Sequence, residues 1–468
     1  MRGTISRRTA MCQMAATGAS ALALGSRAVE NEPKRPNLLI IISDDHNFRA
    51  LGCAGNREIR TPVLDSIAAE GTRFSHCFVS NPICTPSRAC VQTGQYGFHN
   101  AVNFFGQKIA PEAPRLARLL SEAGYTCGYT GKWHNDQRPV HHGFARMKNV
   151  FLGGMNNYDS IPVVQGADDP KAVMNGHPTE IFTDGAIDLL TNLLPEPWCL
   201  FVCYTAPHDP RVTPPGFENE YPVDAVSLPP NFMPQPLFDP GTLDIRDELL
   251  LPRPLDPEAI KIEIGRYYAM IAHVDRSIGR IVDHLKQANQ WENTVVMFGG
   301  DNGLTLGSHG LLGKQTLYEE GVRVPCIVRG PGVRQGAVSG ALVDLMDFMP
   351  TACDYAGVPL PASVDGKSLR GLAEGTAESV RDDIFCHYDD LFRMVRTDRY
   401  KLVLHLKSGR EELFDLREDP FELTDRSADA NFSSVLNELR TVLAGRRTSA
   451  GESVGAQPVA LSGTGHVQ

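Results

Sequence analysis

The stretch Leu38-Leu39-Ile40-Ile41-Ile42-Ser43-Asp44-Asp45 carries the clearest structural signal in the chain, a continuous apolar run followed by a polar cluster. Such a run is typical of a parallel strand that is buried on both faces. Because ligands bind beyond the carboxyl ends of parallel strands, we expect polar residues that follow these strands to meet at one site. Three later runs have the same form: Tyr125–Tyr129 before Lys132 and His134, Cys199–Tyr204 before His208, and Val295–Phe298 before Asp301 and Asn302.

Helical patterns lie between these runs, and the alternation predicts an α/β fold with a large, mostly parallel sheet sandwiched by helices. One helix is predicted to start at Thr61-Pro62, with threonine as the cap and proline in the first turn. A longer helix is predicted from about Glu258 to Ala288. Because His273 and Asp275 flank its apolar stripe, we expect neither to be a ligand. The stripe consists of Ile264, Tyr268, Ile271, Val274, Ile278, Ile281 and Leu285.

After about residue 370 the pattern changes to short alternating runs, which predict a small antiparallel sheet with one helix near Ser433–Leu443. The predicted strands are Phe392–Thr397, Tyr400–Leu406 and Glu412–Asp415. The proline-rich segment 208–257 has no sustained period, and we interpret it as a wall or lid over the site, with a plain surface excursion as the alternative.

The N-terminus resembles an export signal, because Arg2, Arg7 and Arg8 precede the apolar stretch Met11–Leu24. We expect a signal over residues 1–28, with the twin-arginine route favoured over the Sec route, and hence a periplasmic or secreted protein. The other predicted parts are a catalytic domain over 36–370, a small C-terminal subdomain over 371–447, and a disordered tail over 448–468. We expect no stable membrane insertion, because no later stretch has the length of a transmembrane helix.

The composition is that of a globular protein, with 468 residues, 42% hydrophobic residues and a formal net charge of −10. The acidic balance argues against nucleic-acid binding, and an anionic substrate would need a local cationic pocket. The 11 cysteines follow no metal-binding spacing, so most are expected in the core.

Asp44, Asp45, Asp301 and Asn302 offer only oxygen ligands, which favours calcium over zinc. Singly, each pair could be a helix cap or a tight turn, but together at two strand ends they indicate a metal site. Cys84-Thr85-Pro86-Ser87-Arg88 is predicted to open a helix, where the positive helix end would activate the thiol. A plain cysteine and histidine nucleophile is therefore one interpretation, although it gives the calcium no role.

The pentapeptide at Cys84 matches the Cys-x-Pro-Ser-Arg signature of the type I sulfatases, the formylglycine-dependent family of the alkaline phosphatase superfamily. The resemblance covers roughly residues 36 to 425. It departs from the family at Gln95, where arginine is usual, and at Asn135-Asp136, where leucine-glycine is common; the first change could impair maturation, and the second could reflect specificity. Other segments that resemble family blocks, in the family's order, are Asp44-Asp45, Gly131–His134, Ala206–Pro210, Asp301–Gly303, Gly313–Gly321 and Glu412–Leu416.

The resemblance implies that a maturation enzyme oxidises Cys84 to formylglycine (3-oxoalanine), whose hydrate attacks the sulfate ester. Cys84 would then join Asp44, Asp45, Asp301 and Asn302 around the calcium ion. Arg88, Lys132 and Lys314 would supply positive charge. His208, with Lys314, would protonate the leaving alcohol, and His134 would remove the proton that releases sulfate. Lys132, His208, Lys314 and His309 are the expected substrate contacts, with a loop-structural role as the alternative for His309. His141 and His142 are expected to be structural.

Together these observations predict an exported, calcium-dependent sulfatase that acts on a sulfated carbohydrate, as in sulfated polysaccharide degradation. The alternatives are an aryl or choline sulfatase, or a phosphonate or phosphate diester hydrolase on the same fold. A non-catalytic protein that binds sulfated glycans, with Cys84 never oxidised, is a further alternative. The set of Arg88, Lys132, His134, His208 and Lys314 argues against this last class, because a binding protein would not need both an acid and a base.

Overall fold

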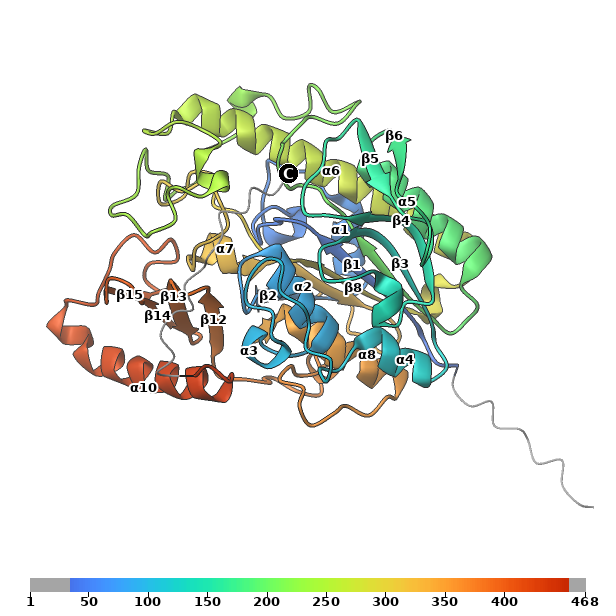
Figure 1. Cartoon of the computed structure of the whole chain (residues 1–468). Helices are drawn as coiled ribbons and strands as arrows, with labels where there is room; N and C mark the ends of the chain where they lie inside the picture. The colour runs from blue at the N-terminus through green and yellow to red at the C-terminus, as the bar shows by residue number, and fades with distance from the viewer. Residues whose placement is uncertain (1–33, 454–468) are drawn as a thin grey trace, which may run out of the picture. The chain divides into compact units, whose positions relative to one another are not determined.

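The strand predicted at residues 38–42 is β1 (Asn37–Ser43), which lies in the middle of a nine-stranded sheet. The computed structural model describes residues 34–453, so the predicted export signal and residues 454–468 lie outside the described part. β1 pairs in parallel with β7 (Trp198–Cys203) and β8 (Thr294–Gly300), and β7 pairs in parallel with β3 (Thr126–Trp133). The four predicted strands are therefore neighbours that run in the same direction, and their carboxyl ends lie at the same end of the sheet (Figure 1).

The whole sheet has the order β11-β2-β10-β8-β1-β7-β3-β4, with β9 paired to β2. The strand β10 is antiparallel to both of its neighbours, so the sheet is mostly but not entirely parallel. The added strands are β2 (Thr72–Phe78), β4 (Arg146–Leu152), β9 (Arg323–Val324), β10 (Cys326–Arg329) and β11 (Ala337–Asp344). A separate hairpin consists of β5 (Ser160–Val163) and β6 (Ala172–Asn175).

Helices cover both faces of the sheet, as the predicted fold class requires (Figure 1). Alternate residues of β1 face opposite sides: Leu38 and Ile40 belong to one core with α2, α4 and α8, and Leu39 and Ile41 belong to another with α1, α5 and α6. The helices are α1 (Pro62–Ala69), α2 (Cys84–Thr93), α3 (Gly97–Asn100), α4 (Leu116–Glu122), α5 (Pro178–Asp188), α6 (Pro257–Gln287), α7 (Glu319–Val322), α8 (Phe348–Ala356), α9 (Arg370–Glu374) and α10 (Ser433–Ser449).

The long helix α6 has the predicted apolar stripe, except that Tyr267 is buried where Tyr268 was expected. Asp275 is no ligand of the strand-end cluster; its carboxylate accepts hydrogen bonds from the Val63 and Leu64 amides at 3.1 and 2.7 Å and so caps α1. The predicted side-chain cap at Thr61 is wrong, because its hydroxyl donates to Asp65 instead. His273 hydrogen-bonds Glu180 at 2.6 Å.

The predicted C-terminal sheet is present and has four antiparallel strands, one more than the sequence indicated (Figure 1). The strands are β12 (Ile384–Tyr388), β13 (Phe392–Arg396), β14 (Tyr400–His405) and β15 (Glu411–Asp415). The helix α10 continues to Ser449, so Thr448 and Ser449 are helical although the tail was expected to start there. Its Leu436, Leu439 and Leu443 pack in a core with Phe385 and Val395 of the sheet.

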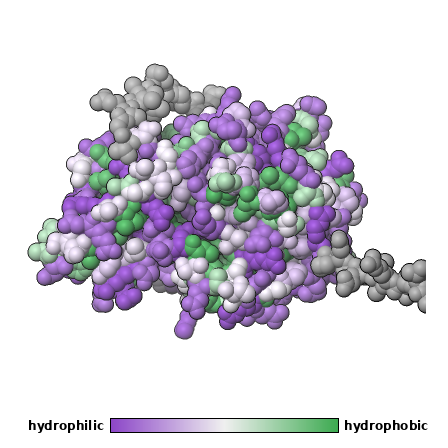
Figure 2. Space-filling view, turned by 90° about the horizontal axis from the view of Figure 1, so that it is seen from below, coloured by the Kyte–Doolittle hydropathy of each residue, from purple (hydrophilic) through white to green (hydrophobic). Residues whose placement is uncertain are grey.

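The cysteines that the structure describes are all free, and most lie in the core as expected. Between residues 34 and 453 no helix has the length and apolar character that crossing a membrane requires. On the face shown in Figure 2, hydrophilic residues predominate and hydrophobic residues form small separate groups. This pattern agrees with the acidic, globular composition.

Candidate active site

The polar residues after the predicted strands come together, as expected, at the carboxyl edge of the sheet. Asp44 and Asp45 follow β1, and Asp301 and Asn302 follow β8; all four are fully buried. Asp45 has a left-handed backbone, with φ of 61°. The Asp301 carboxylate accepts a hydrogen bond from the Asp45 amide at 3.1 Å, which ties the two strand ends together.

The acidic cluster could hold a hard cation. Potential ligand atoms of Asp44, Asp45, Cys84 and His208 lie within 4.8 Å of one another, and all four residues are buried. Asp44 Oδ1, Asp45 Oδ2 and Asn302 Oδ1 are buried without a hydrogen-bond partner in the described part of the chain. Buried oxygens without partners are rare in folded proteins, and carboxylate and amide oxygens are the ligands that calcium prefers. The residues therefore fit the predicted ion.

Asp301 and Asn302 contribute differently to this set. Both Asp301 oxygens are engaged, one with the Asp45 amide and the other with Arg88 Nε at 2.8 Å. The Asn302 amide nitrogen donates to Asp45 Oδ1 at 2.7 Å, which leaves its own carbonyl oxygen free. The role of Asp301 as a direct ligand stays a prediction, whereas its position beside the other ligands is clear.

Cys84 is the first residue of α2, as predicted, and its side chain is buried. The Lys314 ammonium lies 3.3 Å from Cys84 Sγ and 2.6 Å from Asp45 Oδ1. Burial opposes the charge on Lys314, but Asp45 and Cys84 outweigh it and hold the lysine pKa well above its usual value. Lys314 therefore stays cationic beside the sulfur.

Lys132 reaches the site through an irregularity in β3. The register of β3 with β4 shifts between Tyr129 and Gly131, and Gly131 has a φ of 97°. A Cβ at Gly131 would lie 1.9 Å from the Cys203 carbonyl oxygen, so this close approach requires glycine. Lys132 is in the strand itself rather than after it, is fully buried, and pairs with Asp44.

The central charges balance one for one. Lys132, Lys314 and Arg88 face Asp44, Asp45 and Asp301. Burial raises the pKa of Asp44 well above its usual value, and Asp301 nearby raises it further, although Lys132 opposes both effects. A bound cation would relieve this repulsion, and it would also leave the centre positive enough to receive an anion.

The two predicted catalytic histidines lie in different environments. Burial and the cations Lys132, Arg88 and Lys314 hold the His134 pKa well below its usual value, so its ring is neutral. His208 Nδ1 donates to the Asp209 carbonyl oxygen at 2.8 Å, and its Nε2 lies 3.8 Å from Asp45 Oδ2. Nε2 of His208 therefore points into the cluster.

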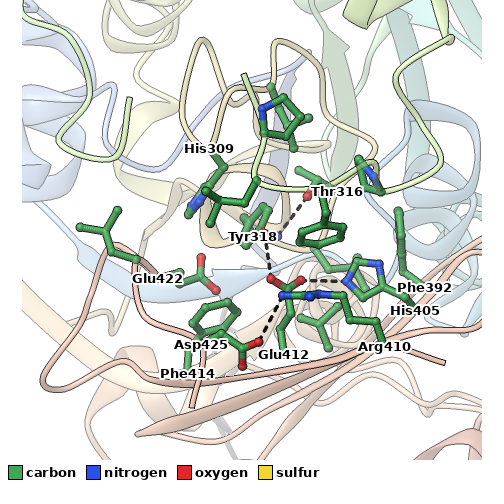
Figure 3. Close-up of a pocket in the computed structure, with 18 of the residues that line it drawn as sticks. His309, Thr316, Tyr318, Phe392, His405, Arg410, Glu412, Phe414, Glu422 and Asp425 are labelled. Carbon is green, nitrogen blue, oxygen red and sulfur yellow. Dashed lines mark hydrogen bonds and ion pairs between the residues drawn. The ribbon is translucent and has the colours of Figure 1, made fainter. Parts of the chain in front are cut away.

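His309 is not among the central residues. Its ring stacks on Tyr318 with ring centroids 3.8 Å apart, and its Nε2 accepts from Asn231 at 3.0 Å. It lines a small pocket between the segment around Phe238 and the C-terminal sheet (Figure 3). The volume of about 50 Å³ would hold a few water molecules rather than a sugar ring. These contacts favour a structural role for His309.

Some supporting residues could not be found from the sequence. The Tyr267 hydroxyl of α6 donates to the Asp45 carbonyl oxygen and accepts from the Asn47 amide, both at 2.7 Å. The Tyr158 hydroxyl donates to the His208 carbonyl oxygen at 2.9 Å. Such contacts join a side chain to a distant backbone atom and leave no local motif. Arg246 pairs with Asp209, in a segment that the sequence marked only as a wall or lid.

The two departures from the family pattern have structural partners. The Asn135 amide donates to the Thr85 carbonyl oxygen at 2.9 Å, which ties the segment after β3 to the Cys84 motif. Gln95 is buried, and its amide donates to the Ser363 carbonyl oxygen at 2.8 Å. His142 accepts from Arg115 at 3.2 Å, which agrees with its predicted structural role.

Comparison with known families and curated proteins finds sulfatases. The sulfatase family profile matches residues 36–358, and the profile for the C-terminal part of N-sulphoglucosamine sulphohydrolase matches residues 307–449. The chain is 28% identical to an N-acetylglucosamine-6-O-sulfatase of Bacteroides thetaiotaomicron, over 91% of this chain and 88% of the relative. It is also 28% identical to an arylsulfatase of Clostridium perfringens, over 87% and 94%.

Solved structures of other enzymes superpose on nearly the whole chain. One protein, determined in complex with its substrate D-glucosamine-2-N,6-O-disulfate, superposes with a TM-score of 0.79 at 26% identity, over 90% of this chain and 99% of that protein. A phosphonate monoester hydrolase of Agrobacterium radiobacter superposes with a TM-score of 0.75 at 22% identity, over 89% and 96%, and shares the fold.

Proposed function

The chain belongs to the sulfatase family and is a sulfuric ester hydrolase, and we propose that it cleaves a sulfated carbohydrate using calcium and a formylglycine made from Cys84. The observation that carries the proposal is the buried grouping of Cys84, Lys314 and three oxygens without partners. Relatives named for the desulfation of N-acetylglucosamine and of Δ4,5-hexuronate support a saccharide substrate.

Formylglycine at position 84 would supply a hydrated aldehyde as the nucleophile, and calcium in the acidic cluster would supply a divalent charge beside the sulfate oxygens. Asp44, Asp45, Asp301, Asn302 and the modified position 84 would hold the ion. Arg88, Lys132 and Lys314 would face the anionic ester with fixed positive charge. Because the cluster is buried, this charge acts without screening by bulk water.

Proton transfer is assigned to the two histidines. The His134 ring is neutral, and its buried Nδ1 has no hydrogen-bond partner among the described residues, so this nitrogen is free to receive the proton. His208 is held by Asp209 and Tyr158 with Nε2 directed at the cluster, where it would protonate the leaving alcohol with help from Lys314. We also propose that the predicted signal over residues 1–28 exports the protein to the periplasm or the medium, where sulfated glycans are degraded.

His208→Ala tests the acid. We expect kcat for a sulfated sugar, which has a poor leaving group, to fall about 100-fold or more, and kcat for p-nitrophenyl sulfate to fall less than about 10-fold, because an activated phenolate leaves without a proton. The exposed His141→Ala is the matched control and should change neither rate. An equal loss on both substrates would remove the acid role.

The proposal itself is tested by peptide mass spectrometry across Cys84 on protein from the native host, followed by turnover of a panel of sulfated sugars, aryl sulfates, choline sulfate, and phosphate and phosphonate esters. We expect the mass change of thiol-to-aldehyde conversion and the highest kcat/KM on a sulfated sugar. An unmodified Cys84 in native protein would contradict the formylglycine, with Gln95 the first position to examine. Preferred turnover of phosphorus esters would contradict the substrate class.

A further inference from the structure

Phe105 is the one aromatic residue with an exposed side chain among residues 34–453, at 40% exposure. The other phenylalanines, tyrosines and tryptophans in the described part are buried or half-buried. An exposed apolar side chain alone is ordinary on a protein surface. Its place in the molecule is what makes Phe105 informative.

The Phe105 ring lies against His134. The two ring centroids are 5.7 Å apart with an angle of 38° between the planes. A Cβ at Gly154 would come within 2.6 Å of His134 Cε1, so the Gly154 backbone also closely approaches this imidazole. Phe105 and Gly154 thus border the proposed base, and Phe105 is the neighbour that offers an apolar face to solvent.

The segment that carries Phe105 is anchored on both sides. The Asn103 and Phe104 amides donate to Gln107 Oε1 at 2.6 and 3.0 Å. The Asn103 carbonyl oxygen accepts from Asn81 at 3.1 Å, and Asn103 Oδ1 lies 2.9 Å from His387 Nε2 in β12. These bonds fix the turn while its tip remains exposed, so the Phe105 ring is oriented before any ligand binds.

The neighbouring ring supports this orientation. Phe104 packs edge-on against Phe105, with centroids 5.2 Å apart, and on its other side lies 6.3 Å from Tyr388 of the C-terminal sheet. Phe104 therefore packs between Phe105 and Tyr388. Because the turn is held by the hydrogen bonds to Gln107, removing the Phe105 ring should not disturb it.

We propose that Phe105 is a specificity-determining residue that packs against the apolar C–H face of the sugar ring bearing the sulfate. This inference rests on the proposed function and deepens it. The central cluster offers charge for the sulfate group, whereas a pyranose adds an apolar face that needs an apolar partner. Covering the exposed part of a phenyl ring stabilises a complex enough to change affinity about 10-fold.

The test compares Phe105→Ala and Phe105→Tyr with the wild-type enzyme on the sulfated monosaccharide that the panel identifies. We expect Phe105→Ala to raise KM about 10-fold with kcat little changed, because the contact binds substrate and transition state equally. Phe105→Tyr keeps the flat face and should retain the wild-type KM. Val338→Ala, which shortens a 60% exposed side chain on β11, is the matched control for the loss of exposed apolar surface.

Inorganic sulfate separates a sugar contact from an indirect effect through His134. Its inhibition constant should be the same in Phe105→Ala and wild type, since sulfate has no sugar ring. An unchanged KM for the sugar, or a parallel rise in the sulfate inhibition constant, would overturn the inference. If the wild-type enzyme cleaves no sulfated sugar, the proposed function fails instead. Thermal melting of each variant confirms that the changes are compared on folded protein.

Discussion

Cys84→Ser is expected to abolish turnover while the protein stays folded. A serine that stays unoxidised has one hydroxyl and lacks the second hydroxyl of the aldehyde hydrate, which allows sulfate to be eliminated. We expect kcat/KM to fall on the order of 10⁴-fold or more, because the nucleophile is lost completely. The melting temperature should change little, since serine and cysteine are close in size and Cys84 Sγ has Lys314 as its polar neighbour.

The matched control for this change is Cys90→Ala on the same helix. Cys90 is also free and buried, and it contacts Asn100 rather than any residue of the central cluster. Cys90→Ala should lower stability modestly through the lost buried sulfur and keep its activity. Near-normal turnover by Cys84→Ser, with the serine shown to be unmodified by peptide mass spectrometry, would reject position 84 as the source of the nucleophile.

Removal of the metal is expected to have the second-largest effect. Dialysis of the native enzyme against EGTA should lower kcat on the order of 10³-fold, and added calcium should restore it. Asp44→Asn should reduce the calcium content measured by atomic emission from one equivalent to near zero, because Asp44 Oδ1 is one of the buried oxygens without a partner.

The Asp44→Asn variant needs a stability control. The side chain of Lys132 is fully buried and pairs with Asp44, so the substitution leaves a buried charge with a weakened partner. Breaking a buried ion pair lowers the free energy of unfolding by about 3–5 kcal/mol in comparable cases. Asp398→Asn, whose side chain is 81% exposed, is the matched control and should keep metal and activity. If zinc but not calcium restores kcat after EGTA treatment, the prediction of calcium is wrong. If the enzyme is insensitive to EGTA and Asp44→Asn is fully active, the predicted metal site is rejected.

The centre of the sheet and the central residues could be predicted because both leave local signals. The buried strand at 38–42 is a continuous apolar run, and Asp44-Asp45 follows directly, so the geometry of parallel strands brings it to Asp301. The edge strands were harder to predict. The strand β2 alternates buried and half-buried residues, and β11 is half-exposed along its first part, so neither forms the continuous apolar run that marks β1.

The supporting contacts could not be predicted for a different reason. The predicted apolar stripe of α6 included Tyr268 and did not include Tyr267, although Tyr267 is the buried one of the two, because shifting the stripe by one residue fits the apolar pattern almost equally well. The hydrogen bond of Tyr267 to the Asp45 carbonyl oxygen joins residues 222 positions apart in the chain. Phe105 gave no signal either, since its significance depends on a histidine in another strand–loop segment.

The balance of three cations against three carboxylates bears on how the reaction ends. With a divalent ion in place, the centre would carry two positive charges. A sulfate ester brings one negative charge, but free inorganic sulfate brings two and neutralises the centre completely. With the ion bound, the same electrostatics that attract the ester would hold free sulfate more tightly than the ester group. This charge pattern would then slow the departure of sulfate rather than the cleavage of the ester bond, and we expect product release to limit turnover.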